Sequence, residues 1–377
     1  MLSAGLERLS HAALQTRGVR LSAPTMFKSS FKNERLRPQF TLDARFDEGL
    51  EYSISVGAGV KHSSLYYHTE EIRAATKSLM SRGPNGVRVG GESLPRTSLE
   101  NTRGIWDAFG ATIRGQVATR RELEKLQRYA IYAPQTGFLR GVENEILPNE
   151  PIGLLGHGLP AALNVLLNHR REVAKKNPAA ARLMRNVLDV VWAPGWANSL
   201  SVENFNDDRV SREVKTGKQT LYLKDRFMRE SRNKLSAYDS SEGTLFLAFM
   251  AVLMLHPDAP KIFALDNVDN ALNPAMTTAL LAKLIEVTCS EKYRAQKIGP
   301  EQVFLTSHNP TALDAFDLFE PDQRIFIVSR NMPSGKTTIT PLLPGKGWTK
   351  EDWIKAKAGQ NLSQLWIEGG LTGALTL

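Results

Sequence analysis

The chain has 377 residues, of which 42% are hydrophobic, so it is long enough to bury the core of one large or two moderate domains. Lys and Arg (48) outnumber Asp and Glu (39), and the formal net charge of +9 permits acidic partners such as nucleic acid without showing them. Cys289 is the only cysteine, which excludes a fold organised by disulfides within the chain and a metal site made of cysteines. No stretch has the features of a secretion signal or the about 20 apolar residues of a membrane helix, so we expect a cytoplasmic protein that does not enter a membrane.

The chain opens with apolar residues at helical spacing, which predict a helix over residues 1–9 with no capping residue before it. Residues 1–40 are rich in Arg and Ser and poor in acids, so a mitochondrial transit peptide is an alternative. Alternation of apolar and polar residues begins soon afterwards, over 40–46 and 51–56, and it predicts two strands of a meander. This early start favours a folded N-terminal region over a transit peptide.

The middle of the chain is the least informative part. Its apolar periodicity predicts a helix over residues 99–126, a short strand over 130–134, and a second helix over 161–169. A Gly-rich loop, 153–160, precedes the second helix, but it has no lysine and not the spacing of a phosphate-binding loop. We therefore interpret this loop as a tight connection and His157 as a structural residue.

Basic residues concentrate in two predicted helices, over residues 114–128 and 169–176. Two interpretations remain open for them. Each can be a solvated helix face, or each can contact the phosphates of a nucleic acid. Aromatic residues do not interleave with either segment as they would in a surface on which bases stack.

A polar segment, Ser240 to Thr244, opens the apolar stretch 245–255, so a serine and a glycine stand where a helix begins. The free N–H groups and the dipole at a helix N-terminus can hold a phosphate. The alternative is that the segment only caps the helix. The apolar stretch is too short to span a bilayer and predicts a core helix.

Two further apolar segments each end on a polar residue. Residues 261–266 predict a strand that ends on Asp266, and residues 302–308 predict one that ends on His308. Ligands bind at the carboxyl edge of parallel strands, and an aspartate there can hold the Mg²⁺ of a bound nucleotide. Taken singly, Asp266 can instead cap the next helix, and His308 can be a core or capping residue.

Read in order, these pieces resemble the signature motif, the Walker B strand and the His switch of ABC-type ATPase heads. The sequence reads SSEGT over 240–244, LDNVDNALNP over 265–274 and TSHNP over 306–310. It is most similar to the branch that contains the overcoming-lysogenization-defect (OLD) nucleases, RecF and the SMC proteins. The resemblance is specific over 220–345, and it implies an α/β fold with a mixed sheet flanked by helices.

The resemblance also implies a division of the chain. Residues 1–60 would be a remnant of the N-terminal ATPase lobe and residues 61–200 a helical or α+β insertion arm. Residues 201–345 would form the C-terminal lobe with the three motifs, and residues 346–377 a tail.

The sequence contains no phosphate loop of the form Gly-x-x-x-x-Gly-Lys-Ser/Thr. Gly335, Lys336 and Thr337 match its end, but the flanking segments 325–329 and 337–340 predict two strands joined by a turn. In the resembled family the phosphate loop directly precedes a helix like the one predicted at the N-terminus, so we expect it immediately before Met1. A miscalled start, a split gene or a truncated paralogue would each have this result.

The mechanism that the resemblance implies is a head-to-tail homodimer with ATP and Mg²⁺ between the subunits. Asp266 would order Mg²⁺ and His308 would sense the γ-phosphate. Ser241, Glu242 and Gly243 of the other subunit would face that phosphate through a helix N-terminus. We expect Gly243→Asp to block ATP-driven pairing with little change in stability.

Asn267 stands where most ABC heads have a glutamate that activates water. Because an amide cannot take a proton, this residue predicts slow turnover, and Asp269 could substitute only if its loop turns it inward. We expect an ATP-dependent switch ATPase of the OLD-like kind in a prokaryotic anti-phage or toxin module, acting with an effector protein or with DNA. No acidic cluster of a built-in nuclease follows the head. The alternative is a non-enzymatic, ATPase-deficient scaffold.

Overall fold

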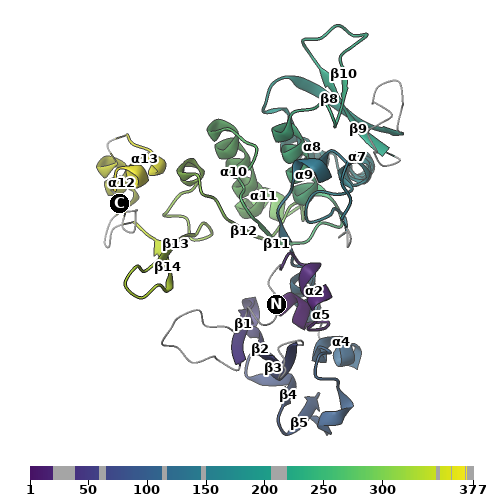
Figure 1. Cartoon of the computed structure of the whole chain (residues 1–377), viewed down its shortest axis with the longest axis vertical. Coiled ribbons are helices and arrows are strands. Elements are labelled where there is room, and N and C mark those ends of the chain that lie inside the picture. The colour runs from purple at the N-terminus through teal and green to yellow at the C-terminus, as the bar shows by residue number, and fades with distance from the viewer. Residues whose placement is uncertain are drawn as a thin grey trace. The chain divides into compact units, whose positions relative to one another are not determined.

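The computed structural model describes residues 1–19, 39–58, 65–112, 117–145, 150–204, 219–344, 349–357, 359–369 and 371. Helices and strands are mixed, which confirms the α/β class (Figure 1). The chain forms two compact units, one of residues 1–131 and 260–264, the other of residues 132–259 and 265–377. Two strands, β7 (Ile131–Tyr132) and β11 (Ile262–Leu265), contribute residues to both units. Among the described residues, no helix is long and apolar enough to cross a membrane.

Unit 1 is built on a six-stranded antiparallel meander in which the strands follow chain order. The strands are β1 (Gln39–Arg45), β2 (Leu50–Ala58), β3 (Leu65–Ala74), β4 (Lys77–Gly83), β5 (Gly86–Val89) and β6 (Glu92–Leu94), with short 3-10 turns η1 (Asp47–Gly49) and η2 (Arg96–Ser98). β1 and β2 confirm the two predicted strands, and Phe40 lies opposite Val56 in their register. The other four strands were not predicted.

The interior of this sheet contains a buried ion pair, which interrupts its hydrophobic pattern. Both oxygens of Glu70 accept hydrogen bonds, from Arg82, from the Tyr52 hydroxyl (3.0 Å) and from the backbone N–H of Ile105 (3.0 and 3.1 Å). The side chains of Glu70 and Arg82 are 0% and 5% exposed. Burial raises the pKa of the Glu70 carboxyl, and the Arg82 guanidinium opposes that shift. The pair joins three strands to the first turn of α4 (Ile105–Phe109).

The predicted N-terminal helix is shorter than expected. α1 covers Leu2–Gly5, and α2 covers His11–Gln15. Between them the backbone pairs with a distant segment, because the N–H of Leu9 donates to the carbonyl of Thr102 (2.8 Å) and the N–H of Gly104 donates to that of Glu7 (2.7 Å). These bonds occupy backbone N–H and carbonyl groups that would pair with each other inside a longer helix.

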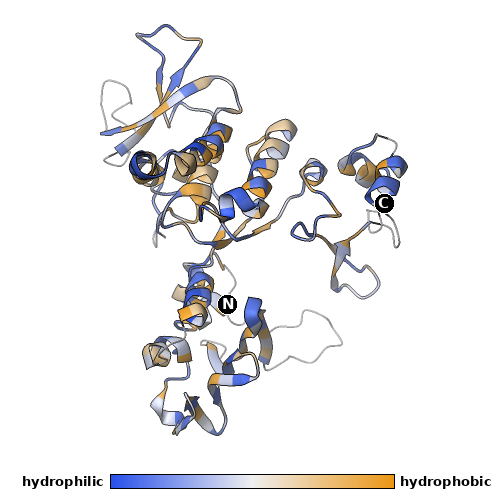
Figure 2. Ribbon diagram, turned by 180° about the vertical axis from the view of Figure 1, so that it is seen from behind, coloured by the Kyte–Doolittle hydropathy of each residue, from blue (hydrophilic) through white to orange (hydrophobic). Residues whose placement is uncertain are grey.

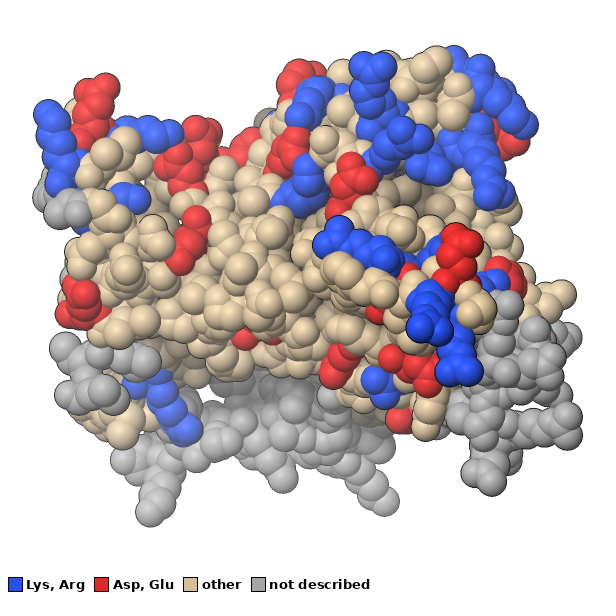
Figure 3. Space-filling model, turned by 90° about the horizontal axis from the view of Figure 1, so that it is seen from above, with Lys and Arg blue, Asp and Glu red and all other residues tan. Residues whose placement is uncertain are grey.

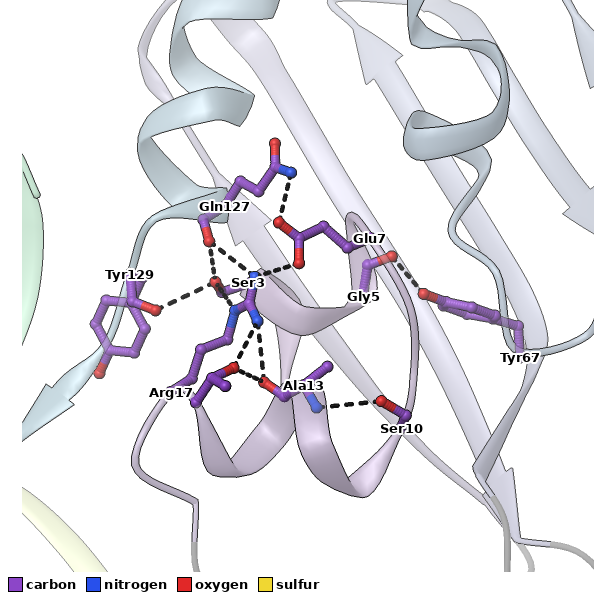
Figure 4. Close-up of polar contacts among 10 residues, drawn as sticks. Ser3, Gly5, Glu7, Ser10, Ala13, Arg17, Tyr67, Gln127 and Tyr129 are labelled. Atoms are coloured by element: carbon purple, nitrogen blue, oxygen red, sulfur yellow. Dashed lines mark hydrogen bonds and ion pairs between the residues drawn. The ribbon is translucent and has the colours of Figure 1, made fainter. Parts of the chain in front are cut away.

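Arg17 holds the N-terminal helices against α5 (Val117–Gln127), as Figure 4 shows. Its guanidinium donates to the Ser3 hydroxyl (2.7 Å), the Ala13 carbonyl (2.9 Å), the Glu7 carboxylate (2.8 Å) and the Gln127 carbonyl (3.2 Å). Because the planar guanidinium has several fixed donors, one buried side chain satisfies groups from three helices.

The helix predicted over residues 99–126 is broken. The structure has α4, then η3 (Gly110–Thr112), then α5, and no helix over 99–104. The carbonyl of Asn101 instead accepts from the N–H of Tyr67 (2.9 Å). Apolar spacing alone could not show that the backbone at Asn101 would hydrogen-bond to a strand of the sheet in unit 1 instead of forming a helix.

Unit 2 surrounds α9 (Glu242–Leu255), in which every residue from Gly243 to Leu255 is buried. This confirms the predicted core helix. The helix is apolar on all sides, and orange residues run through its helix cluster in Figure 2. Packed against it are α6 (Thr136–Leu139), α7 (Leu159–Lys176), α8 (Pro178–Leu188) and η4 (Asp189–Trp192). The Gly-rich segment before α7 is a connection, as predicted. The helix itself continues to Lys176, seven residues beyond the predicted end at residue 169.

The remaining elements of unit 2 form smaller groups. A three-stranded antiparallel sheet has the order β10 (Lys234–Ser236), β9 (Gln219–Asp225), β8 (Ala197–Asn204). The C-terminal part consists of α10 (Pro274–Cys289), α11 (Glu291–Arg294), β12 (Gln302–Leu305), η5 (Pro310–Ala315), β13 (Ile325–Arg330), β14 (Thr337–Leu342), α12 (Lys350–Ala356) and α13 (Leu362–Ile367).

The segment that matches the end of a phosphate loop is a hairpin turn, as predicted. β13 and β14 pair antiparallel, with Arg330 opposite Thr337. The N–H of Asn331 donates to the carbonyl of Lys336 (2.8 Å), and Gly335 has a φ of +67°, which favours glycine. The strand β14, and not a helix, directly follows this turn, so it does not have the structure of a phosphate loop.

Candidate nucleotide site

The ends of β11 and β12 lie side by side in unit 2. The N–H of Thr306, the first residue after β12, donates to the carbonyl of Leu265 (3.1 Å). The Thr306 hydroxyl donates to the Asp266 carboxylate (2.6 Å) and accepts from the N–H of Asn267 (2.9 Å). Asp266 is therefore fixed at an exposed strand end by a residue from the neighbouring strand. We did not predict this role for Thr306, although it opens the TSHNP segment.

His308 lies on the exposed loop between β12 and η5, because β12 ends at Leu305 and is shorter than predicted. Its imidazole makes no hydrogen bond to another described residue. Asn309 caps η5 instead, with its side chain accepting from the N–H of Thr311 (3.0 Å). The alternative that His308 is a core or capping residue is therefore wrong.

The loop after Asp266 has an unusual backbone. Asn267 has a φ of +56°, in the left-handed region that Asn tolerates better than Glu. Val268 is buried and anchors the loop. One carboxylate oxygen of Asp269, Oδ1, is buried without a hydrogen-bond partner among the described residues. Part of the Asp269 carboxylate is thus turned away from solvent.

Ser241 stands at the N-cap position of α9, but its side chain makes no capping hydrogen bond. The alternative that this serine only caps the helix is therefore not supported. Glu242 accepts a hydrogen bond from the Thr136 hydroxyl, and the buried Thr244 hydroxyl accepts from the indole N–H of Trp196 (2.9 Å). The start of α9 is fixed by its neighbours while the Ser241 side chain stays exposed.

Gly243 packs closely against the loop that follows Asp266. A Cβ added at Gly243 would lie 2.8 Å from the carbonyl oxygen of Ala271 and 3.4 Å from a methyl of Leu272. Since backbone atoms cannot give way cheaply, the expectation that Gly243→Asp leaves stability nearly unchanged is wrong. The contact also places the start of α9 beside this loop within one subunit.

The side chains at this site fit a cation that protein carboxylates bind together with the phosphates of a ligand. They fit less well a metal ion that only protein side chains hold. Asp266 uses one carboxylate oxygen for Thr306, and Asp269 has one oxygen without a donor. Mg²⁺ binds oxygen ligands and commonly takes one or two carboxylates together with substrate phosphates. No group of three or more His, Cys, Asp or Glu side chains that could hold a metal occurs in the part of the chain that the structure describes.

A family model described as "AAA domain, putative AbiEii toxin, Type IV TA system" matches residues 99–314, more than half of the chain. The chain belongs to this AAA-domain family. The match includes Asp266, Asn267, His308 and the start of α9. Membership supports an ATP-binding function of the P-loop type, with the nucleotide commonly bound together with Mg²⁺.

Three solved structures are similar to this AAA-domain protein at low identity. The SMC head domain from Thermotoga maritima has 11% identity and a TM-score of 0.32, over 83% of this chain and 78% of that one. An SmcHead bound to the C-winged helix domain of ScpA has 11% identity and a TM-score of 0.43, over 92% and 86%. A structure from work on ATP-driven dimerization and DNA stimulated activation of SMC ATPases has 15% identity and a TM-score of 0.28, over 50% and 95%. No curated protein matches the chain.

Proposed function

We propose that this AAA-domain protein is an ATP-dependent switch with an ABC-type, OLD-like head, acting in a prokaryotic anti-phage or toxin module. The observation that carries the proposal is the arrangement around Asp266. Thr306 holds this carboxylate at a strand end, and the following loop packs against the start of α9. ATP-binding folds of the α/β type place their ligands at such strand ends.

The residues of the site have separate roles in this proposal. Asp266 would hold Mg²⁺ through the oxygen that Thr306 leaves free, and Thr306 would keep the Asp266 carboxylate in position. The bound cation would supply positive charge that neutralises the phosphates of ATP. His308, which is exposed and has no hydrogen-bond partner in the described chain, would donate a hydrogen bond to the γ-phosphate.

Turnover would be slow. The Asn267 amide can orient water by hydrogen bonding but cannot accept its proton. Apart from Asp266, which would hold the cation, Asp269 is the nearest carboxylate in sequence, and it is the candidate base. The protein would then spend most of its cycle with ATP bound, which suits a switch that engages an effector protein.

The nucleotide-bound state would be a head-to-tail homodimer. In it, Ser241, Glu242 and Gly243 of one subunit would face the ATP held by the other. The absence of a side-chain cap at Ser241 supports this, since that side chain and the first N–H groups of α9 remain usable. The four-part division at residues 60, 200 and 345 stays a proposal.

A second candidate is a non-enzymatic scaffold that binds its partner without ATP. Its support is that residues 1–377 contain no phosphate-loop sequence, and that the one similar triplet forms the β13–β14 turn. In this case Asp266 and His308 would have no role beyond the fold.

Sedimentation tests the switch. The protein is the chain preceded by a strand and a Gly-x-x-x-x-Gly-Lys-Ser/Thr loop, run with and without Mg-ATP. We expect ATP to produce dimers, and Ser241→Glu to prevent them because it places a carboxylate where the phosphate should bind.

Ser241→Ala is the matched control. It should leave stability nearly unchanged, since no capping bond is lost, and it should still allow dimers. Mixing Ser241→Glu with Asp266→Ala should restore part of the dimer, because one of the two composite sites is then intact. A Ser241→Glu protein that dimerises normally on ATP would refute the head-to-tail arrangement.

A further inference from the structure

The turn between β9 and β10 projects a basic and aromatic sequence into solvent. Every residue from Arg226 to Arg232 is exposed, in the sequence RFMRESR, although most of β9 before it is buried. Phe227 is 74% exposed and Met228 is 43% exposed. We call residues 226–232 the arginine turn.

The three arginines of this turn are not neutralised. Arg226, Arg229 and Arg232 have no ion pair with any described residue, whereas the neighbouring lysines do: Lys224 lies 3.7 Å from the Glu230 carboxylate and Lys234 pairs with Glu203. Glu230 and Glu203 thus have lysine partners, and the Asp225 carboxylate accepts from the backbone N–H of Phe227. The three guanidinium groups remain available to an anionic partner.

Hydrogen bonds to the backbone hold the two ends of the arginine turn. The N–H of Asp225 donates to the carbonyl of Asn233 (2.7 Å), and the Asp225 carboxylate accepts from the N–H of Phe227 (2.7 Å). The N–H of Arg226 donates to the carbonyl of Trp196 (3.0 Å). An ordered turn loses less entropy when it binds a ligand.

Arginine and aromatic groups are adjacent within it. The guanidinium carbon of Arg226 lies 4.6 Å from the centroid of the Phe227 ring. Figure 3 looks down on the end of unit 2 that carries β8, β9 and β10, and Lys and Arg side chains gather there, on the right of the view. Among the residues that the structure describes, the basic helix segments 117–128 and 169–176 have no comparable exposed aromatic residue beside their charges.

We propose that the arginine turn is a binding site for single-stranded nucleic acid. Its three arginines contact successive backbone phosphates, for which the guanidinium fork is well matched. Phe227 stacks on a base, a contact that tolerates any sequence because every base has a flat face. The site is independent of the proposed ATP site, since none of its residues takes part there.

Two other partners are less well matched to the turn. An anionic membrane surface would bind in proportion to the apolar area inserted, and Phe227 and Met228 supply little. An acidic protein segment would satisfy the arginines but would not need the exposed ring. Both alternatives are outcomes of the test.

Fluorescence anisotropy with a labelled single-stranded oligonucleotide, without ATP, measures the proposed binding across a salt series. The variant is Arg226→Gln with Arg229→Gln and Arg232→Gln. We expect its affinity to fall at least about tenfold. The plot of log affinity against log salt concentration should become less steep by about 2, because each of the three lost phosphate contacts contributes about 0.7 to the slope. Because all three side chains are exposed, its melting temperature should not change.

The matched control removes three positive charges elsewhere, by Lys77→Gln, Arg88→Gln and Arg96→Gln on exposed positions of unit 1. It should keep the parent affinity and salt slope. Phe227→Ala should weaken binding of the single strand about tenfold, as expected for loss of one stacked base, and weaken duplex binding less.

Three results would overturn the proposal. The first is that the parent chain does not bind the oligonucleotide, and the second is that the arginine variant and the control lose affinity equally. The third is that the arginine variant loses binding only to phosphatidylserine vesicles or to a poly-glutamate peptide, which would assign the turn to a membrane or to an acidic protein.

Discussion

Backbone conformation explains the residue that departs most from the ATPase pattern. Asn267 adopts a φ of +56°, where Asn is tolerated and a longer side chain is disfavoured by roughly 1 kcal/mol. An amide here therefore has a local structural reason. The sequence motif predicted the position of this residue, but it could not show the conformation, nor that Thr306 would hold both Asp266 and the N–H of Asn267.

Asn267→Glu tests the link between this residue and turnover. In the chain preceded by a phosphate loop, we expect it to raise the rate of phosphate release, because a carboxylate can accept a proton from water. We also expect it to lower the free energy of unfolding by roughly 1 kcal/mol, since Glu must take the left-handed backbone.

Steady-state phosphate release and chemical denaturation measure the two effects, and Asn267→Asp separates them by adding a shorter carboxylate. A rate that is unchanged or lower in both variants would show that water is activated elsewhere. Asp269→Asn would then be the next variant.

At the scale of elements, sequence patterns worked where the periodicity was simple. β1, β2, α9 and the β13–β14 hairpin were predicted, because alternation or a continuous apolar run marked each of them. β3 and β4 were missed because Glu70 and Arg82 occupy interior positions of the sheet, which breaks the expected alternation. β5 and β6 are only four and three residues long, too short for a periodic pattern to show. The prediction of one helix over 99–126 failed because the backbone carbonyls of Asn101 and Thr102 accept hydrogen bonds from distant segments of the chain.

The buried pair Glu70–Arg82 should dominate the stability of unit 1. Glu70→Ala leaves a guanidinium buried without its carboxylate, so we expect a loss of about 3–5 kcal/mol. Glu71→Ala, which removes a partly exposed pair with Arg73, is the control and should cost about 0–1 kcal/mol.

Hydrogen exchange of unit 1 peptides, followed by mass spectrometry, localises the effect to this unit. Replacing both partners, by Glu70→Leu with Arg82→Met, should recover much of the protection because no unpaired charge remains. If Glu70→Ala exchanged as slowly as Glu71→Ala, the pair would not be stabilising the sheet.

At the scale of the whole molecule, the composition limits the kinds of partner, and the structure shows which charged side chains are free to contact one. The net charge of +9 permitted an anionic partner, and the arginine turn is where three of those charges stand exposed and unpaired among the described residues. The sequence drew attention to the segments 114–128 and 169–176 instead, and left open whether they are solvated helix faces or phosphate contacts, because a count of charges does not show which ones acidic neighbours pair. The residues of the proposed nucleotide site were easier to select from the sequence, since they form compact motifs at strand ends.

Calorimetric titration with ATP tests the nucleotide site most directly. Three proteins are compared, each with and without Mg²⁺: residues 1–377, the same chain preceded by a phosphate loop, and the latter with Asp266→Ala. We expect the extended chain to bind Mg-ATP orders of magnitude more tightly than residues 1–377, because each charge-assisted phosphate contact contributes about 1.5–3 kcal/mol. Asp266→Ala should weaken Mg-ATP binding at least about tenfold and leave binding without Mg²⁺ unchanged. Equal affinity for Mg-ATP with and without the Asp266 carboxylate, or micromolar binding by residues 1–377 alone, would contradict the site described here.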